Sequence, residues 1–240
     1  MRSVRAGHVL ALTLPALLFG YLLANQVSTQ SERSALTVRY NTPLIDAAGA
    51  LQKEQADLKA QLADLRGKLD AIQKAAAAQS GAAGELSRQI EDLKLRSGMT
   101  PVVGEGIAVV LDDSKLPTIA KQDLAKAICH STDITDIINT GWKGGAEAIA
   151  VNDERIVGTS SVYCVGATIM VNGTLMSPPF TILMIGPQAS LLRVFDDPGE
   201  LRDIKQRSEV HGLGFRVVRQ REARLPAFTG SVGSRYATPR

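Results

Sequence analysis

The feature that most constrains this chain is a large aliphatic residue repeated at every seventh position. These residues are Leu44, Leu51, Leu58, Leu65 and Ile72. The position four residues after each of the first four is occupied by Ala48, Gln55, Leu62 and Leu69. A repeat kept up for about four heptads predicts a coiled coil, with the first set at position d and the second at position a. We expect a coiled-coil stalk over residues 43–78. Its predicted interface comprises Leu44, Leu51, Gln55, Leu58, Leu62, Leu65, Leu69 and Ile72.

The charges beside this repeat favour self-association. Glu54 falls at position g and Lys59 at the following e position, so the two attract each other across a parallel homodimer. Gln55 at an a position lowers stability but can fix the register. The alternative is a helix that packs on the C-terminal domain of its own chain. The sequence leaves the number and orientation of the strands open.

The N-terminus has the pattern of a membrane anchor. No charged residue occurs from Val9 to Ser31, and the apolar part of this run is just long enough to cross a bilayer. A cleaved signal peptide is the alternative, but Leu22 at the −3 position before Ala24 fits it poorly. Because the preceding residues carry Arg2 and Arg5, we expect residues 1–31 to form a cytoplasmic N-terminus and an uncleaved single-pass anchor. The rest of the chain is then extracytoplasmic at the cell membrane.

The stalk is followed by a change of composition. Small residues at 75–84 interrupt the heptads, so residues 79–99 are expected to form a joint and a short helix. Without the anchor and the stalk, about 140 residues remain, which is enough for one core, and we expect that domain over residues 100–222. Residues 223–240 have the composition of turns and are expected to form a disordered tail.

Within the domain, apolar runs and turn residues indicate alternating strands and helices. Asn172-Gly173 is a strong hairpin signal. Ser131 or Thr132 can cap a helix over residues 133–141, and Pro198-Gly199 can split a helix over residues 188–207. Strands are expected near residues 107–111, 146–151, 167–171, 180–185 and 212–218. The predicted class is α+β, with a mixed sheet in ferredoxin-like style and helices on one face.

Charge and cysteine content narrow the function classes. The net charge is +3 and aromatic residues make up 4% of the chain, which argues against nucleic acid as a partner. The three histidines are scattered, so no metal or other cofactor is predicted. Cys129 and Cys164 could form one disulfide outside the cytoplasm, and two buried free thiols are the alternative. No catalytic constellation is predicted.

Three segments of the domain resemble a known family. They are GEGIAVVLDDS (104–114), DITDIINTGWKGGAEAIAVNDERI (133–156) and SSVYCVGATIMVNGTLMSPPFTILMIG (160–186). They are similar to the bacterial domain of unknown function 881 family, which includes the YlxW/YlxX-type, division-initiation-like membrane proteins. One departure is Tyr163, where that family leads us to expect a basic residue. The resemblance implies a single-pass membrane protein with an extracytoplasmic α+β domain, and it supplies no catalytic residue.

These patterns predict a non-enzymatic membrane protein. We expect it to self-associate through the coiled coil and to present its domain to envelope or division proteins. Two alternatives stay open at this point. One is a component that resembles a pilus or secretion assembly platform, and the other is a small-ligand-binding domain with the glycine-bearing turns as the places to look.

Overall fold

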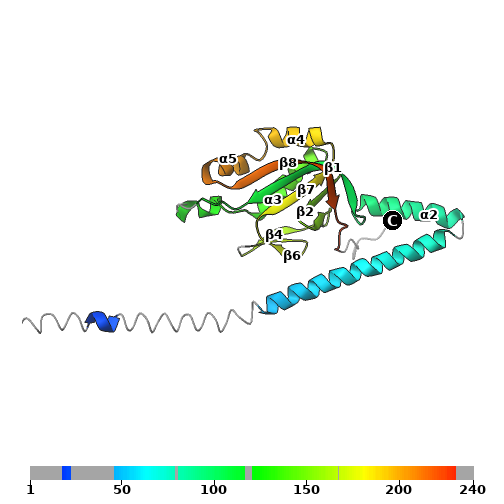
Figure 1. Cartoon of the computed structure of the whole chain (residues 1–240), viewed down its shortest axis with the longest axis horizontal. Coiled ribbons are helices and arrows are strands. Elements are labelled where there is room, and N and C mark those ends of the chain that lie inside the picture. The colour runs from blue at the N-terminus through cyan, green and yellow to red at the C-terminus, as the bar shows by residue number, and fades with distance from the viewer. Residues whose placement is uncertain (1–17, 23–45, 79–80, 117–120, 167, 231–240) are drawn as a thin grey trace, which may run out of the picture. The chain divides into compact units, whose positions relative to one another are not determined.

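The computed structural model of this chain describes residues 18–22, 46–78, 81–116, 121–166 and 168–230 (Figure 1). The chain divides into two compact units, Met1–Leu58 and Lys59–Arg240. Of the predicted anchor, only residues 18–22 are described, and they are helical. No helix within the described ranges is both long and apolar enough to cross a membrane.

A five-stranded sheet forms the centre of the larger unit. Its order is β3-β2-β7-β1-β8. The strands are β1 (Val102–Asp112), β2 (Ala148–Val151), β3 (Glu154–Ile156), β7 (Phe180–Ile185) and β8 (Gly214–Leu225). All four pairings are antiparallel, and β1 lies between β7 and β8. The expectation of a mixed sheet is therefore wrong for these strands, and the ferredoxin-like topology is not confirmed.

A second, separate sheet has three strands, which lie between β3 and β7 in the sequence. It consists of β4 (Val162–Val165), β5 (Thr168–Val171) and β6 (Thr174–Met176), in that order. Asn172 and Gly173 both have positive φ, of 50° and 82°, as the tight turn between β5 and β6 requires. The hairpin predicted there is confirmed. Asn152 has a φ of 50° in the corresponding turn between β2 and β3.

Three helices pack on one face of the larger sheet (Figure 1). They are α3 (Ser131–Lys143), α4 (Gln188–Asp196) and α5 (Arg202–His211), and a short 3-10 helix, η1 (Lys121–Lys126), precedes α3. Alternate strand residues meet these helices because side chains of a strand point to opposite faces in turn. The main core joins Ile107, Val109 and Leu111 of β1 to Ile134 and Ile137 of α3 and to Leu191 and Phe195 of α4. The class is thus α+β.

Two boundaries differ from the expected ones. Helix α3 begins at Ser131, and its N-cap is His130, whose backbone N–H donates to Asp133 Oδ2 at 2.8 Å. The expected caps, Ser131 and Thr132, already lie inside the helix. At the other end, β8 runs to Leu225 and Phe228 is buried, so the expected domain end at residue 222 falls inside a strand. The expected tail extends into residues 231–240, which lie outside the described residues.

Gly106 is required by the close approach of two strands. A Cβ atom at this position would overlap the carbonyl oxygen of Met184 on β7, and the register of β1 against β8 shifts between Gly104 and Gly106. This bulge explains the Gly104-Glu105-Gly106 sequence structurally.

We expect Gly106→Ala to lower the free energy of unfolding by about 1–3 kcal/mol, because the added methyl group must push β1 away from β7. Urea denaturation followed by circular dichroism measures the change. Gly158→Ala is the matched control, since a Cβ there would meet no atom within 4 Å. Equal stability of the two variants would contradict the close approach.

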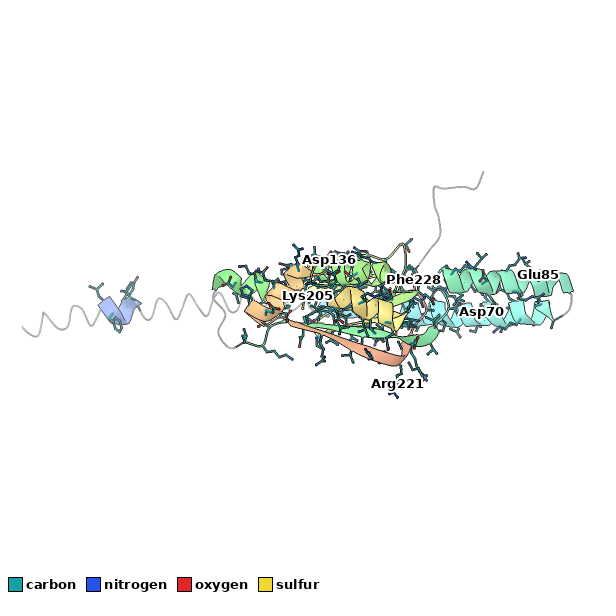
Figure 2. All side chains as sticks on the ribbon, turned by 90° about the horizontal axis from the view of Figure 1, so that it is seen from above. Asp70, Glu85, Asp136, Lys205, Arg221 and Phe228 are labelled. Carbon is teal, nitrogen blue, oxygen red and sulfur yellow. The ribbon has the colours of Figure 1, made fainter. Side chains whose placement is uncertain are left out.

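Two further helices precede the sheet. One covers residues 46–77 and is called the stalk helix below, and the other is α2 (Gly81–Arg96). Figure 2 shows Asp70 and Glu85 on these two helices, which lie next to each other. Lys94 of α2 forms an ion pair with Asp70 and donates to Gln73 Oε1 at 2.9 Å, which fixes the two as a helical hairpin.

Candidate functional site

The aliphatic repeat of the stalk helix is exposed in the single chain. We call Leu51, Leu58, Leu65, Leu69 and Ile72 the leucine stripe. The exposed fractions of its members range from 51% for Leu69 to 66% for Ile72. Gln55 and Leu62, predicted for the same interface, are half-buried, and Leu44 lies outside the described residues. The stalk helix therefore carries a row of large aliphatic side chains that the described residues leave exposed.

A different face of the stalk helix contacts the domain. Lys59 Nζ lies 2.5 Å from Glu154 Oε1 and 2.7 Å from Thr174 Oγ1. Arg66, seven residues later, donates to the carbonyl oxygens of Phe228 at 2.7 Å and Gly230 at 3.0 Å. Both residues occupy position e of the heptad. The alternative of a helix packed on its own domain is thus seen here, but through polar e positions and not through the leucine stripe.

The hairpin with α2 also leaves the leucines uncovered. Among the α2 residues whose burial is described, the half-buried ones are Ala83, Gly84, Ser87, Ile90 and Lys94. A Cβ atom at Gly84 would lie 3.6 Å from the carbonyl oxygen of Ala77, so the helices approach closely at their connected ends. Leu86 and Leu93 of α2 are 59% and 64% exposed. The hairpin thus leaves large apolar side chains of both helices exposed, while mainly small and polar residues, with Ile90 among them, are half-buried.

A buried charge cluster joins the start of α3 to α5. The guanidinium of Arg207 donates to Asp133 Oδ1 at 2.7 Å, to Asp203 Oδ2 at 2.9 Å and to the carbonyl oxygen of Ile128 at 2.6 Å. Burial by itself lowers the pKa of Arg207, but the hydrogen bonds to Asp133 and Asp203 outweigh it, so the net pKa is raised. The partners of Arg207 are thus two carboxylates and a backbone carbonyl oxygen, and these hydrogen bonds fix α5 against α3.

The two cysteines are free thiols. Cys129 is half-buried, and its backbone N–H donates to Asp113 Oδ1 at 2.7 Å. Burial, with the nearby Asp113 carboxylate, raises the pKa of the Cys129 thiol well above its usual range. Cys164 is exposed, and its sulfur lies 3.3 Å from the backbone nitrogen and from Oγ of Ser131. The structure therefore shows no disulfide between them, and the expectation of burial is wrong for Cys164.

These surroundings predict unequal thiol reactivity. A disulfide reagent attacks the thiolate, which a raised pKa makes scarce at Cys129, whereas Cys164 is open to solvent. We expect Ellman's reagent to modify one thiol per native chain rapidly and the other only on unfolding in urea. Cys164→Ser should remove the fast phase and Cys129→Ser the slow one. Two equally fast thiols would contradict this assignment.

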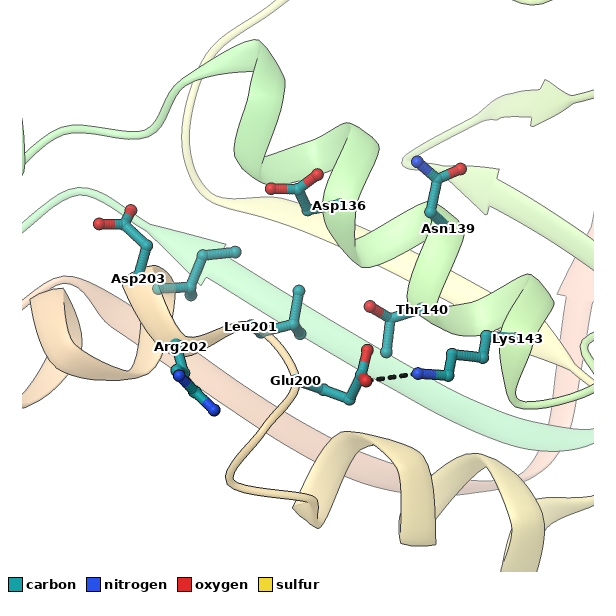
Figure 3. A pocket seen from close by; sticks show the side chains of 9 residues that line it. Asp136, Asn139, Thr140, Lys143, Glu200, Leu201, Arg202 and Asp203 are labelled. Atoms are coloured by element: carbon teal, nitrogen blue, oxygen red, sulfur yellow. Dashed lines mark hydrogen bonds and ion pairs between the residues drawn. The ribbon is translucent and has the colours of Figure 1, made fainter.

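A cleft between α3 and the connection from α4 to α5 is shown in Figure 3. Its volume is about 340 Å³, and it is lined by Asp136, Asn139, Thr140, Lys143 and the residues from Glu200 to Ile204. Lys143 Nζ lies 2.5 Å from Glu200 Oε1, so the principal cation and one carboxylate neutralise each other. Leu201 has a φ of 51°, a left-handed conformation that is unusual for a branched residue.

Among the described residues, no group of three or more His, Cys, Asp or Glu side chains is arranged to hold a metal ion. His130 lies 3.3 Å from Arg207 through its Nδ1 and belongs to the charge cluster at α3. The glycine-bearing turns also have structural reasons, since Gly104 lies against Ile185 and Gly173 completes a hairpin.

Sequence reasoning missed the e-position contacts of the stalk helix. Lys59 was expected to pair with Glu54 of a second helix, whereas here it meets Glu154, which is 95 residues away. Asp113 Oδ1 likewise accepts the backbone N–H of Cys129, which is 16 residues away. The one available signal was the series Lys59, Arg66, Gln73 at successive e positions, which is polar throughout.

Comparisons with known proteins identify relatives of unknown function. A family model described as a bacterial protein of unknown function, DUF881, matches residues 89–238. UPF0749 protein Rv1823 of Mycobacterium tuberculosis (strain ATCC 25618 / H37Rv) is 28% identical over 217 residues, which cover 88% of this chain and 69% of that protein. UPF0749 protein YlxW of Bacillus subtilis (strain 168) is 32% identical over 114 residues, or 47% of this chain and 48% of that protein. The crystal structure of an uncharacterized conserved protein from Mycobacterium tuberculosis aligns with a TM-score of 0.49 at 24% identity, over 63% of this chain and 99% of that one.

Proposed function

This chain belongs to the DUF881 family of bacterial proteins of unknown function, and from its own residues we propose that it is a non-enzymatic, self-associating scaffold. In this proposal residues 1–31 anchor it in the cell membrane and its α+β domain lies outside the cytoplasm. The stalk helix joins copies of the chain to one another. The assembled domains then offer a repeated surface to envelope or division proteins.

The observation that carries the proposal is the exposed leucine stripe. Five large aliphatic side chains on one helix face are more than half exposed, while the polar e positions are engaged with the domain. A contiguous apolar face of this kind marks an interaction surface. The heptad spacing of Leu51, Leu58, Leu65 and Ile72 selects a second helix with the same spacing as its partner, and another copy of this chain supplies one.

The chemistry of the domain supports a role without catalysis. A nucleophilic cysteine has a lowered pKa, whereas the pKa of Cys129 is raised by burial and by Asp113. The buried guanidinium of Arg207 donates to Asp133 and to the carbonyl oxygen of Ile128, and Asp133 also accepts the backbone N–H of His130, so both groups serve to fix α5. These residues resemble structural groups more than members of an active site.

The test is the oligomeric state of the full chain. Sedimentation equilibrium in a density-matched detergent should give a dimer or trimer over the whole accessible concentration range. Cross-linking in cells, followed by mass spectrometry, should then recover envelope or division proteins with the oligomer. A monomer at all concentrations, with no cross-linked envelope protein, would refute the scaffold.

A further inference from the structure

The five-stranded sheet ends in two edge strands that are protected differently. At one edge, β3 has only three residues, all of them buried, and the Asn172 side chain donates to the carbonyl oxygen of Arg155 at 2.9 Å. At the other edge, β8 runs for 12 residues, and β1 is its one strand neighbour within the described residues. Because an edge strand presents a row of backbone N–H and C=O groups, the outer side of β8 can accept a further strand.

The regular part of this edge extends from Gly214 to Gln220, and we call it the β8 edge. Over this range the register of β8 against β1 is continuous, and it shifts only beyond Gln220. The bulge that follows changes the direction of Arg221, which Figure 2 shows pointing away from the domain. The β8 edge is therefore long enough to pair with a strand of ordinary length, which is about 5–6 residues.

Arginines flank the β8 edge on both faces of the sheet. Arg216 and Arg219 are three positions apart in a continuous register, so their side chains lie on opposite faces. Both are exposed, and neither side chain forms an ion pair or a hydrogen bond within the described part of the chain. Between them are Val217 and Val218, of which Val218 is 39% exposed. The edge thus offers two unpaired cations with two β-branched residues between them.

The sign of these charges distinguishes two kinds of occupant. An antiparallel second copy of β8, centred between Val217 and Val218, would place Arg216 of each chain opposite Arg219 of the other, and like charges in this arrangement destabilise a pair of strands. A strand with two carboxylates three positions apart would meet each arginine with an opposite charge. Charged residues protect many edge strands from pairing. Here the charges have one sign, so this protection does not extend to an acidic strand.

We propose that β8 binds an extended acidic segment of a protein partner by strand addition, antiparallel to the β8 edge, with two carboxylates on Arg216 and Arg219. Main-chain hydrogen bonds supply the affinity and the two ion pairs the selectivity. The inference rests on the proposed function and deepens it, because it names the surface of the domain that binds the partner. A monomeric chain would still bind the segment, so a failure of self-association is distinguishable from a failure of this edge.

The probe is the peptide TEVTEVT carrying an uncharged fluorophore. Its two glutamates fall opposite Arg219 and Arg216 when the strands run antiparallel. Fluorescence anisotropy during titration with the full chain in detergent gives the dissociation constant. We expect saturable binding that weakens as the salt concentration rises, because exposed charge pairs are screened. The lysine peptide TKVTKVT should bind at least about 10-fold more weakly. Absence of binding by TEVTEVT, or equal binding of the two peptides, would overturn the proposal.

Backbone methylation separates strand addition from simple charge attraction. In an antiparallel pair, alternate residues of a strand exchange hydrogen bonds with the neighbouring strand, and the residues between them do not. N-methyl groups on one alternate set of TEVTEVT residues should abolish binding, whereas N-methyl groups on the other set should leave it within about threefold. Equal effects of the two methylations would overturn strand addition. This comparison uses the native chain, so it does not depend on the folding of a variant.

Charge reversal then places the peptide on β8. Changing Arg216 and Arg219 together to glutamate should weaken binding of TEVTEVT by about 10-fold or more and strengthen binding of TKVTKVT. The matched control is Arg193→Glu combined with Arg202→Glu, which changes the charge equally at exposed positions of α4 and α5. The control should bind TEVTEVT within about threefold of the native chain. Similar losses in the two variants would reduce the effect to overall charge and overturn the site.

Discussion

Replacing Arg207 with methionine is expected to lower the free energy of unfolding by about 3–5 kcal/mol, the cost of breaking a buried ion pair from one side. The change leaves the carboxylate of Asp133, which is only 4% exposed, without its cation. It also removes the donors for the carbonyl oxygens of Lys126 and Ile128, which hold the segment before α3. Urea denaturation of the full chain, followed by circular dichroism, gives the magnitude.

A matched control separates the buried partner from the exposed one. Asp203 bonds to the same guanidinium, but its side chain is 76% exposed, so Asp203→Asn should cost no more than about 1 kcal/mol. Combining Arg207→Met with Asp133→Asn should restore part of the lost stability, because the stranded charge is then gone. A loss below about 1 kcal/mol for Arg207→Met alone would show that the cluster does not hold α5 in place.

The local elements of the domain could be predicted because their signals lie within a few residues. The apolar run after Gly106 predicted β1, and Asn172-Gly173 predicted the hairpin between β5 and β6. Pro198-Gly199 predicted the break between α4 and α5. Each of these depends on a periodicity or on a backbone angle that the residue type favours. Strand pairing has no such signal, which explains why the sheet was expected to be mixed and is antiparallel.

The candidate sites depended on contacts between distant residues. Arg207 and Asp133 are 74 positions apart, and Arg66 meets a carbonyl oxygen 162 positions away. Neither spacing follows from composition or periodicity. The heptads predict an association surface, which stays a prediction, and they give no sign that Lys59 and Arg66 at e positions contact the chain's own domain.

The two uses of the stalk helix place a condition on any oligomer. Lys59 contacts Glu154 and Thr174 through the e position, so it is not free to pair with Glu54 of a second helix while that contact lasts. Association must then depend on the leucine stripe more than on charges between e and g positions. Salt should accordingly weaken the oligomer little, because apolar burial is not screened as surface charge pairs are.

Changing Leu65, Leu69 and Ile72 together to lysine is expected to abolish self-association of the full chain. These three residues are between 51% and 66% exposed, so they contribute little to the fold of the single chain. If the burial of each side chain contributes about 1.5 kcal/mol, the loss is about 4.5 kcal/mol per helix and about 9 kcal/mol for a dimer, which raises the dissociation constant roughly a million-fold. Sedimentation equilibrium should show a monomer, and thermal unfolding of the domain should occur at an unchanged temperature.

The matched control places the same three charges elsewhere on the same helix. Ala60, Ala63 and Ala71 are exposed and lie outside positions a and d, so changing them to lysine adds an equal charge without touching the leucine stripe. This variant should sediment as the native chain does. If both variants became monomeric, charge repulsion alone would account for the result. If neither did, the chains would be joined by another surface, because six lysines in place of aliphatic side chains cannot be accommodated in the seam of a two-stranded coiled coil.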